Sequence, residues 1–167
     1  MIDISLDYFS LTNYFKSLYG EVPGDYFNPD FTYNNDIKRS SEGLEIHHIK
    51  EWDEKNIFLA NLSNPSIAKR NPFEYQKPEN LCYANLIDHF LLHVKIDLLR
   101  FSKFGRTFTE GSDFLFNKIK YLYDNYEDNL DNSYFLAIED KFNYFKDVYN
   151  YWVKEKSNLV KNSRFKN

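Results

Sequence analysis

Apolar residues recur at every third or fourth position in several stretches of the chain, which is the spacing of one side of an α-helix. An N-terminal helix is expected over residues 7–19. Its apolar side consists of Leu11, Tyr14, Phe15 and Leu18. A second helix is expected between a cap at Asn85 and Gly105, and it is apolar around almost its whole circumference. A helix with so little polar surface is expected at the centre of the fold.

The last third of the chain predicts a helical hairpin over residues 110–158. A cap at Ser112 opens the first helix, and residues 128–132 form the turn before a longer second helix. The apolar positions of the first helix are Leu115, Ile119, Leu122 and Tyr126. Those of the second helix are Phe135, Ile138, Phe142, Phe145, Tyr149 and Trp152. The hairpin has two candidate uses: covering the core, or joining a second copy of the chain as a homodimer.

Two short apolar runs have the character of strands. The first is residues 44–49, and the second begins just after Asn80 and is expected to return beside the first. Residues 20–43 are rich in Gly, Pro, Asn and Asp, which predicts an irregular loop. The segment between the strands is long, and its residues 64–70 carry the cap and proline signals of a short helix.

These elements predict an α+β fold that is mostly helical, with a small two-stranded unit embedded among the helices. A chain of 167 residues suffices for one domain with a buried core. Within this single domain we expect an N-terminal helix and loop over residues 1–43 and a core over residues 44–104. The C-terminal hairpin then completes the domain.

Composition narrows the classes of function. The net charge of −4 excludes a generic nucleic-acid coat. No apolar stretch approaches the roughly 20 residues that span a bilayer, and the first residues lack a signal-peptide pattern. We therefore expect no membrane partner and a cytoplasmic location. The single cysteine, Cys82, excludes an intrachain disulfide framework and is expected to be a small buried residue.

The four histidines form two tight clusters, although a residue type that binds metals and accepts protons is normally scattered. His47 and His48 are adjacent in the first strand, where successive side chains leave opposite faces. One of them is therefore expected to bind an ion while the other faces the substrate. His89 and His93 are one helical turn apart, so both rings lie on one side of the central helix and can chelate one ion.

Asn80 lies between the two histidine clusters, and its amide can pin a turn while orienting a neighbour. A strand with His-His, a strand with Asn and a helix with His-x-x-x-His follow one another along the chain. This order resembles the HNH nucleases, which have the ββα-metal fold, and most closely the colicin-type form with histidine ligands. The resemblance covers about residues 44–96 and includes the spacing from Asn80 to His89. The insert before Asn80 is longer than in compact members of the family.

The resemblance implies a role for each of these residues. His47, His89 and His93 would hold one divalent ion, and His48 would be the general base that takes a proton from the attacking water. Asn80 would hold the loop and orient His48. The implied activity is that of a metal-dependent endonuclease hydrolysing DNA phosphodiester bonds, in restriction, phage or mobile-element processing, defence or a toxin. Mg²⁺ is the usual biological ion, while Zn²⁺, Ni²⁺ and Mn²⁺ stay open because imidazoles are softer ligands than Mg²⁺ prefers.

Other polar residues are candidates for supporting roles. Asp97 continues the row of positions 85, 89 and 93 and is a candidate partner for a ligand imidazole, and Glu45 shares the strand face of His47. The candidate phosphate contacts are Lys69, Arg70, Lys77, Lys95, Arg100, Lys103 and Arg106. The ordinary alternative for each of them is a solvated surface charge.

Alternatives to a nuclease remain open at the level of sequence. One is a metal-stabilised nucleic-acid-binding protein without hydrolytic activity. Another is a purely structural zinc site. Such a site needs four protein ligands, and Cys82 is a poor candidate for the fourth. A helical interaction protein, in which the histidines merely pack, is the third alternative. The sequence carries no readable code for a recognition sequence or for DNA against RNA.

Overall fold

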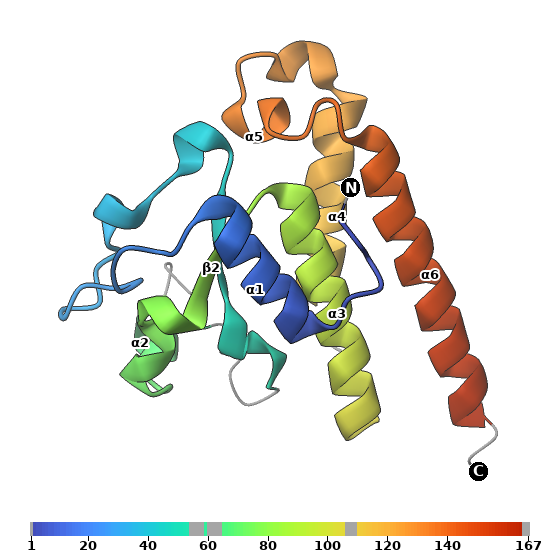
Figure 1. Ribbon diagram of the computed structural model, residues 1–167, viewed down its shortest axis with the longest axis horizontal. Helices are drawn as coiled ribbons and strands as arrows, with labels where there is room; N and C mark the ends of the chain where they lie inside the picture. Colours follow the sequence, from blue (N-terminus) through green and yellow to red (C-terminus); the bar gives the residue numbers. More distant parts are fainter. Residues whose placement is uncertain (1, 54–58, 60–64, 106–109, 165–167) are drawn as a thin grey trace.

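A computed structural model describes residues 2–53, 59, 65–105 and 110–164 of the chain. The described part is mostly helical and contains one small two-stranded antiparallel sheet (Figure 1). The expected α+β class is therefore confirmed. None of the described helices has the length and apolar character needed to cross a membrane.

The central helix is α3 (Leu86–Phe104), and its two ends lie where the sequence places them. The Asn85 side chain accepts hydrogen bonds from the backbone N–H groups of Ile87 and Asp88, which otherwise have no partner in the first turn. Gly105 ends the helix in a left-handed conformation with φ of 72°. Helices α1, α4 and α6 all pack against α3, so its expected central place is confirmed (Figure 1).

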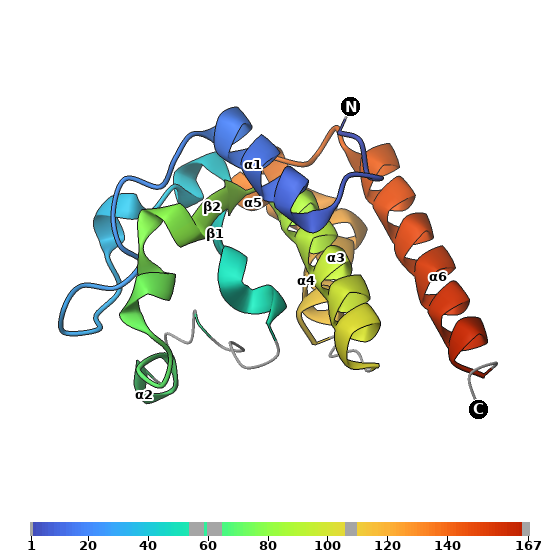
Figure 2. The same cartoon turned by 60° about the horizontal axis from the view of Figure 1, so that its bottom comes forward.

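The sheet consists of β1 (Glu45–His48) and β2 (Leu81–Ala84), which pair with His47 opposite Cys82 and His48 opposite Leu81. All four residues of β2 are buried, and Asn85 alone separates this strand from α3. Helix α1 packs on β2, and α3 lies between the sheet and α6 (Figure 2). This short connection holds the start of α3 beside the end of the sheet, and Cys82 is buried as expected.

Helix α1 (Tyr8–Tyr19) begins at an Asp7 cap, in agreement with the expected range. Its buried side consists of Tyr8, Leu11, Thr12 and Phe15. Tyr14 and Leu18 are 41% and 50% exposed, so the expected apolar side is wrong by part of a turn. The reason is that the polar-tipped Tyr8 is directed into the core, where its hydroxyl finds two hydrogen-bond partners.

In their described residues, the two segments between the main elements contain only short structure. Residues 20–43 hold two 3₁₀ turns, Asn35–Ile37 and Ser40–Glu42, and an isolated bridge between Phe27 and Tyr33. In the insert, the expected short helix is the single turn α2 (Pro65–Ala68). Two further 3₁₀ turns, Phe73–Gln76 and Pro78–Asn80, lead into β2.

The C-terminal part differs from the expected hairpin in two ways. Ser112 is not a cap, because it lies inside α4 (Glu110–Asp124), where its buried hydroxyl donates to Asp97. The expected second helix is two helices, α5 (Ser133–Leu136) and α6 (Phe142–Arg164). Apolar spacing continues across the break because residues on both sides of it enter the same core, and spacing alone reports burial rather than backbone continuity.

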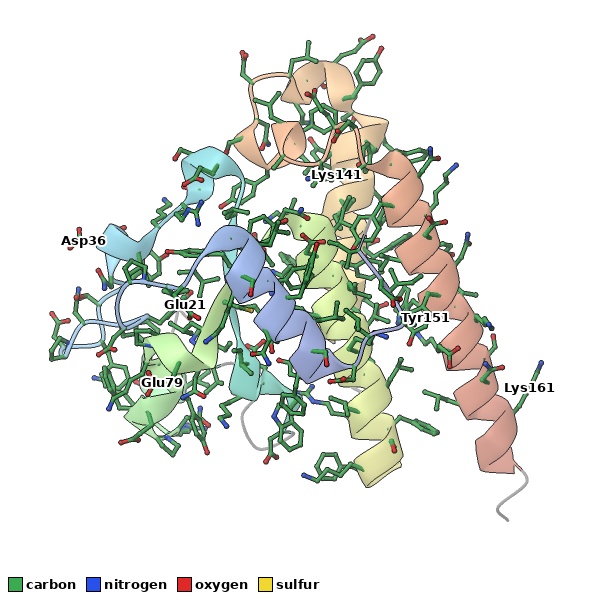
Figure 3. All side chains as sticks on the ribbon, in the orientation of Figure 1. Glu21, Asp36, Glu79, Lys141, Tyr151 and Lys161 are labelled. Carbon is green, nitrogen blue, oxygen red and sulfur yellow. The ribbon has the colours of Figure 1, made fainter. Side chains whose placement is uncertain are left out.

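Exposed charged side chains lie at the periphery of the molecule, and apolar side chains fill most of the space around α3. The exposed residues labelled in Figure 3 include Glu21, Asp36 and Lys161. The main core cluster joins α1, β2, α3, α4 and α6. The C-terminal helices therefore cover the core within this chain.

Gly43 provides a test of how the segment before β1 is held. It has a φ of 69°, and a Cβ at this position would collide with the carbonyl oxygen of Ser133 and the Cβ of Ala137 in and after α5. Gly105 is also left-handed but has open space around it. Alanine at either position costs about 1–2 kcal/mol of backbone strain, and only Gly43→Ala adds an overpacking cost of about 1–3 kcal/mol. Urea unfolding followed by tryptophan fluorescence should show this difference, and equal losses would contradict the packing of α5 on this turn.

Candidate metal centre

Three histidines from two separate segments converge beside the sheet. His47 comes from β1, and His89 and His93 come from α3. One ring nitrogen of each lies within 4.8 Å of the others. The ring centroids are separated by 5.1 Å for His47 and His89, 5.2 Å for His47 and His93, and 4.9 Å for His89 and His93. We call this group the histidine triad, and its rings are close enough to share one ion after a small inward movement.

Hydrogen bonding fixes which nitrogen of His47 carries the proton. The Tyr8 hydroxyl donates to the carbonyl oxygen of Ile49 at 2.9 Å, so its single proton is already used. The same hydroxyl lies 2.8 Å from Nε2 of His47 and must therefore accept from it. Nδ1 of His47 then carries a lone pair, is buried, and has no hydrogen-bond partner among the described residues. A buried nitrogen in this state is a natural metal ligand.

His89 is oriented by a carboxylate from the sheet. Its Nδ1 lies 2.8 Å from Oε2 of Glu45, and the other oxygen of Glu45 accepts from Lys118 of α4. Burial acts to raise the pKa of Glu45, but the hydrogen bonds and charges of His89 and Lys118 outweigh it and lower that pKa to about 2. An ionised Glu45 can only accept, so Nδ1 of His89 donates and Nε2 is left for an ion. Glu45, which shares the strand face of His47, therefore contacts the site through His89.

His93 is held by the close approach of α4. A Cβ on Gly111 would collide with Nδ1 of His93, so the glycine allows this ring to occupy its place. Nε2 of His93 lies 3.7 Å from Oε2 of Glu51. Burial and the neighbouring His89 keep the pKa of His93 well below its usual value, and burial with His89 and His93 does the same for His47. Both imidazoles are therefore neutral near pH 7, the form that binds metal ions.

Glu51 is one residue of the site that sequence reasoning missed. It lies in the 3₁₀ turn Ile49–Trp52 directly after β1, and its Oε2 is 3.9 Å from Nδ1 of His47. Burial raises the pKa of Glu51 to about 7, against the opposing effects of His89 and Arg100. The sequence offers one signal, the position of Glu51 four residues after His47, but a turn after a strand has no fixed periodicity from which to derive the contact.

The structure places His48 on the opposite face of β1 from His47. Its Nε2 lies 2.8 Å from Oε1 of Gln76, whose amide nitrogen donates to the carbonyl oxygen of Leu59. The ring also makes an edge contact with Tyr26 at a centroid distance of 4.4 Å. His48 is 1% exposed, so its ring is covered in this conformation rather than open to a substrate. The other face is covered because the 20–43 loop and the end of the insert both pack there.

Asn80 holds the insert and is not the residue that contacts His48. Its amide nitrogen donates to the carbonyl oxygen of Glu74 at 2.7 Å, which closes the loop before β2 as expected. Gln76, in the same loop, makes a hydrogen bond with His48 and so orients it, a role that the resemblance implied for Asn80. Gln76 was not found from the sequence, because a lone glutamine in an irregular segment carries no pattern.

Three expected supporting residues serve the fold instead of the site. Asp97 accepts from Ser112 at 2.6 Å and not from a described histidine, and burial raises its pKa to about 6. Lys95 is buried and donates to the hydroxyl of Tyr151 on α6. Arg100 is buried and donates to the backbone carbonyls of Glu51 and Trp52. Lys95 and Arg100, the two candidate phosphate contacts among them, are thus engaged by Tyr151 and by the turn after β1.

The other candidate phosphate contacts lie nearer the surface. Lys69 and Arg70 are exposed, and the ammonium of Lys69 lies 5.1 Å from the ring centre of Phe31. Lys103 lies over the Trp52 ring at 4.4 Å. Lys77 is partly exposed, and Arg106 lies outside the described residues.

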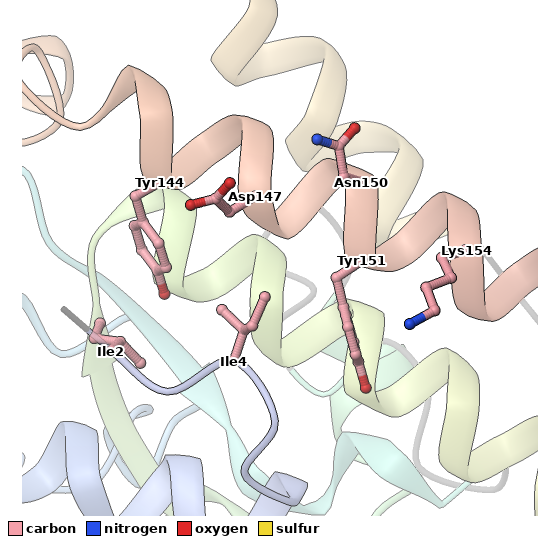
Figure 4. Close-up of a pocket in the computed structure, with 7 residues that line it drawn as sticks. All are labelled: Ile2, Ile4, Tyr144, Asp147, Asn150, Tyr151 and Lys154. Atoms are coloured by element: carbon pink, nitrogen blue, oxygen red, sulfur yellow. The ribbon is translucent and has the colours of Figure 1, made fainter.

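A separate pocket shares no lining residue with the triad. It has a volume of about 320 Å³ and is formed between the N-terminal segment and α6 (Figure 4). Ile2 and Ile4 line one side, and Tyr144, Asp147 and Tyr151 are among the residues on the other. None of the triad residues lines it, so we do not assign it to the metal centre.

The Tyr8 hydroxyl provides the first test of the centre. Tyr8→Phe removes the acceptor for Nε2 of His47, and we expect the affinity for Zn²⁺ to fall by about 10–100-fold, as for other partners of metal ligands. Competition with a chromophoric chelator measures this change. Tyr14→Phe is the matched control, because Tyr14 lies on the same helix and is exposed. Equal affinities of the two variants would contradict the assigned protonation of His47.

Gly111 provides a second test that removes no ligand. Gly111 has no positive φ, so alanine should favour helix α4 by up to about 1 kcal/mol. The new methyl group would nevertheless push His93 away from the triad. We expect Gly111→Ala to remain folded by circular dichroism and to bind Zn²⁺ more weakly by calorimetry. Unchanged binding would show that His93 is not held as described.

Comparisons of the chain with protein-family models, with curated proteins and with solved structures gave no match. The function proposed below is therefore argued from the geometry of the centre and from the order of its residues along the chain.

Proposed function

We propose that this protein is a metal-dependent endonuclease that hydrolyses DNA phosphodiester bonds, and that β1, β2 and α3 act as an HNH-type ββα-metal unit. The observation that carries the proposal is the convergence of the histidine triad from β1 and α3, with Nδ1 of His47 buried and without a partner. The antiparallel pairing of β1 and β2 and the immediate entry into α3 support the same arrangement.

The donor set of the triad fits a divalent ion. The protonation argument assigns Nδ1 of His47 and Nε2 of His89 as ligand atoms, and Nε2 of His93 is directed toward the same space. An ion bound there would act as a Lewis acid on the scissile phosphate and the leaving oxygen. Imidazole nitrogens suit Zn²⁺, Ni²⁺ and Mn²⁺ better than Mg²⁺.

His48 is the proposed general base. Its Nε2 donates to Gln76, so Nδ1 is the proton-accepting nitrogen and has no partner among the described residues. Burial lowers the pKa of His48 to about 4, so the ring is unprotonated near pH 7. The cover over this face includes Tyr26, and substrate would have to displace it to reach Nδ1.

A second candidate is a metal-stabilised protein that binds nucleic acid without hydrolysing it. The observation that favours it is the burial of His48 together with the carboxylate of Glu51 beside the triad. A structural zinc site needs four protein ligands and no open position, and Glu51 is a better candidate for the fourth ligand than Cys82.

Incubation with supercoiled plasmid and a panel of divalent ions separates the two candidates. We expect the wild-type protein to cleave the plasmid, and His48→Ala to retain metal while losing about 10²–10⁴-fold in rate. His89→Ala should lose both metal and cleavage. Tyr14→Phe serves as the control variant.

Two outcomes of this experiment would contradict parts of the proposal. Full cleavage by His48→Ala would refute the assigned base. A wild-type protein that binds metal and nucleic acid but cleaves nothing with any ion would favour the second candidate.

A further inference from the structure

The carboxylate of Glu51 lies near one ring nitrogen of His47 and one of His93 without a hydrogen bond to either. Its Oε2 lies 3.9 Å from Nδ1 of His47 and 3.7 Å from Nε2 of His93. Both separations exceed the roughly 2.7–3.2 Å of a hydrogen bond to nitrogen. They are close to the separation of about 3.4 Å between two ligands at 2.1 Å from one tetrahedral ion.

The lone pair on Nδ1 of His47 and the carboxylate of Glu51 face the same space. Nδ1 of His47 is an acceptor, because the Tyr8 hydroxyl fixes the proton of that ring on Nε2. A carboxylate oxygen is also an acceptor, and His47 is buried with 1% exposure. A ring lone pair and a carboxylate oxygen that face each other repel unless a proton or a metal ion lies between them, and these separations are too long for a shared proton. This argument points to an ion that is shared by His47 and Glu51.

The backbone that carries Glu51 is fixed at both ends of its turn. Tyr8 donates to the carbonyl oxygen of Ile49 at the start of the turn. Arg100 of α3 donates to the carbonyl oxygens of Glu51 and Trp52. The carboxylate is thereby held beside the triad by two elements, α1 and α3, that also position the triad itself.

We propose that Glu51 is the fourth protein ligand of the ion and that it determines which ions leave room for substrate. A tetrahedral ion such as Zn²⁺ is fully enclosed by three imidazoles and one carboxylate. A six-coordinate ion such as Mn²⁺ keeps two further positions for water and a phosphate oxygen. The first part stands on geometry alone, and the consequence for substrate rests on the proposed nuclease function.

The ligand role is tested by metal binding without any measurement of cleavage. Co²⁺ is the spectroscopic probe, because four-coordinate Co²⁺ absorbs visible light much more strongly than six-coordinate Co²⁺. We expect an intense spectrum for the wild-type protein, bands shifted in position and intensity for Glu51→Gln and Glu51→Ala, where water would take the place of the carboxylate, and a fall of more than about 10-fold in Zn²⁺ affinity. Glu139→Gln, an exposed change far along the chain, is the matched control.

Circular dichroism of the metal-free variants checks that they fold, and Glu51→Gln keeps the volume of the side chain if Glu51→Ala does not fold. An unchanged Co²⁺ spectrum and Zn²⁺ affinity in folded Glu51→Gln would overturn the ligand role.

The consequence for substrate is tested separately with supercoiled plasmid. We expect Mn²⁺ to support cleavage by the wild-type protein, Zn²⁺ to inhibit it, and Glu51→Ala to become active with Zn²⁺. Equal cleavage with Zn²⁺ and Mn²⁺ in the wild-type protein would contradict the enclosure of Zn²⁺. A changed Co²⁺ spectrum in Glu51→Gln, with no cleavage by any form, would refute the nuclease function and leave the ligand role intact.

Discussion

The hydroxyl of Tyr8 carries one proton, and the arrangement of the centre depends on where that proton goes. It is donated to the carbonyl oxygen of Ile49, which leaves the oxygen of the hydroxyl as an acceptor for Nε2 of His47. This places the lone pair of His47 on Nδ1, toward His89 and His93. The same hydrogen bond begins the turn that carries Glu51. A single side chain of α1 therefore sets the protonation of one proposed ligand and the position of another.

The origin of the ligands couples the centre to folding. A strand of four residues with one partner strand is only marginally stable by itself. The triad joins this strand to α3, and Glu45 extends the connection to α4 through Lys118. An ion bound to the triad would therefore stabilise the packing of β1 on the helices, because its binding energy is available only in the folded arrangement. Helix α4 packs close to His93 at Gly111, where a side chain would displace the ring from the triad.

Periodicity and capping signals predicted the elements that position the histidine triad, since the caps Asn85 and Gly105 and the spacing of the histidines are local properties of the sequence. They did not predict Tyr8, Glu51 or Gln76 as parts of the site. Each of these residues acts through individual contacts that are distant in sequence or come from an irregular turn, and such contacts leave no repeat. The break between α5 and α6 was missed for a related reason, because core residues continue on both sides of it.

The charges around the proposed ion suit a phosphodiester. Glu45 is ionised but is paired with Lys118, so it contributes little net charge to the centre. The three imidazoles are neutral ligands, and Glu51 would cancel one of the two positive charges of a divalent ion. One positive charge then remains in a largely buried space, where an unpaired charge is costly. A phosphodiester carries one negative charge per phosphate, so its binding would bring the centre to neutrality.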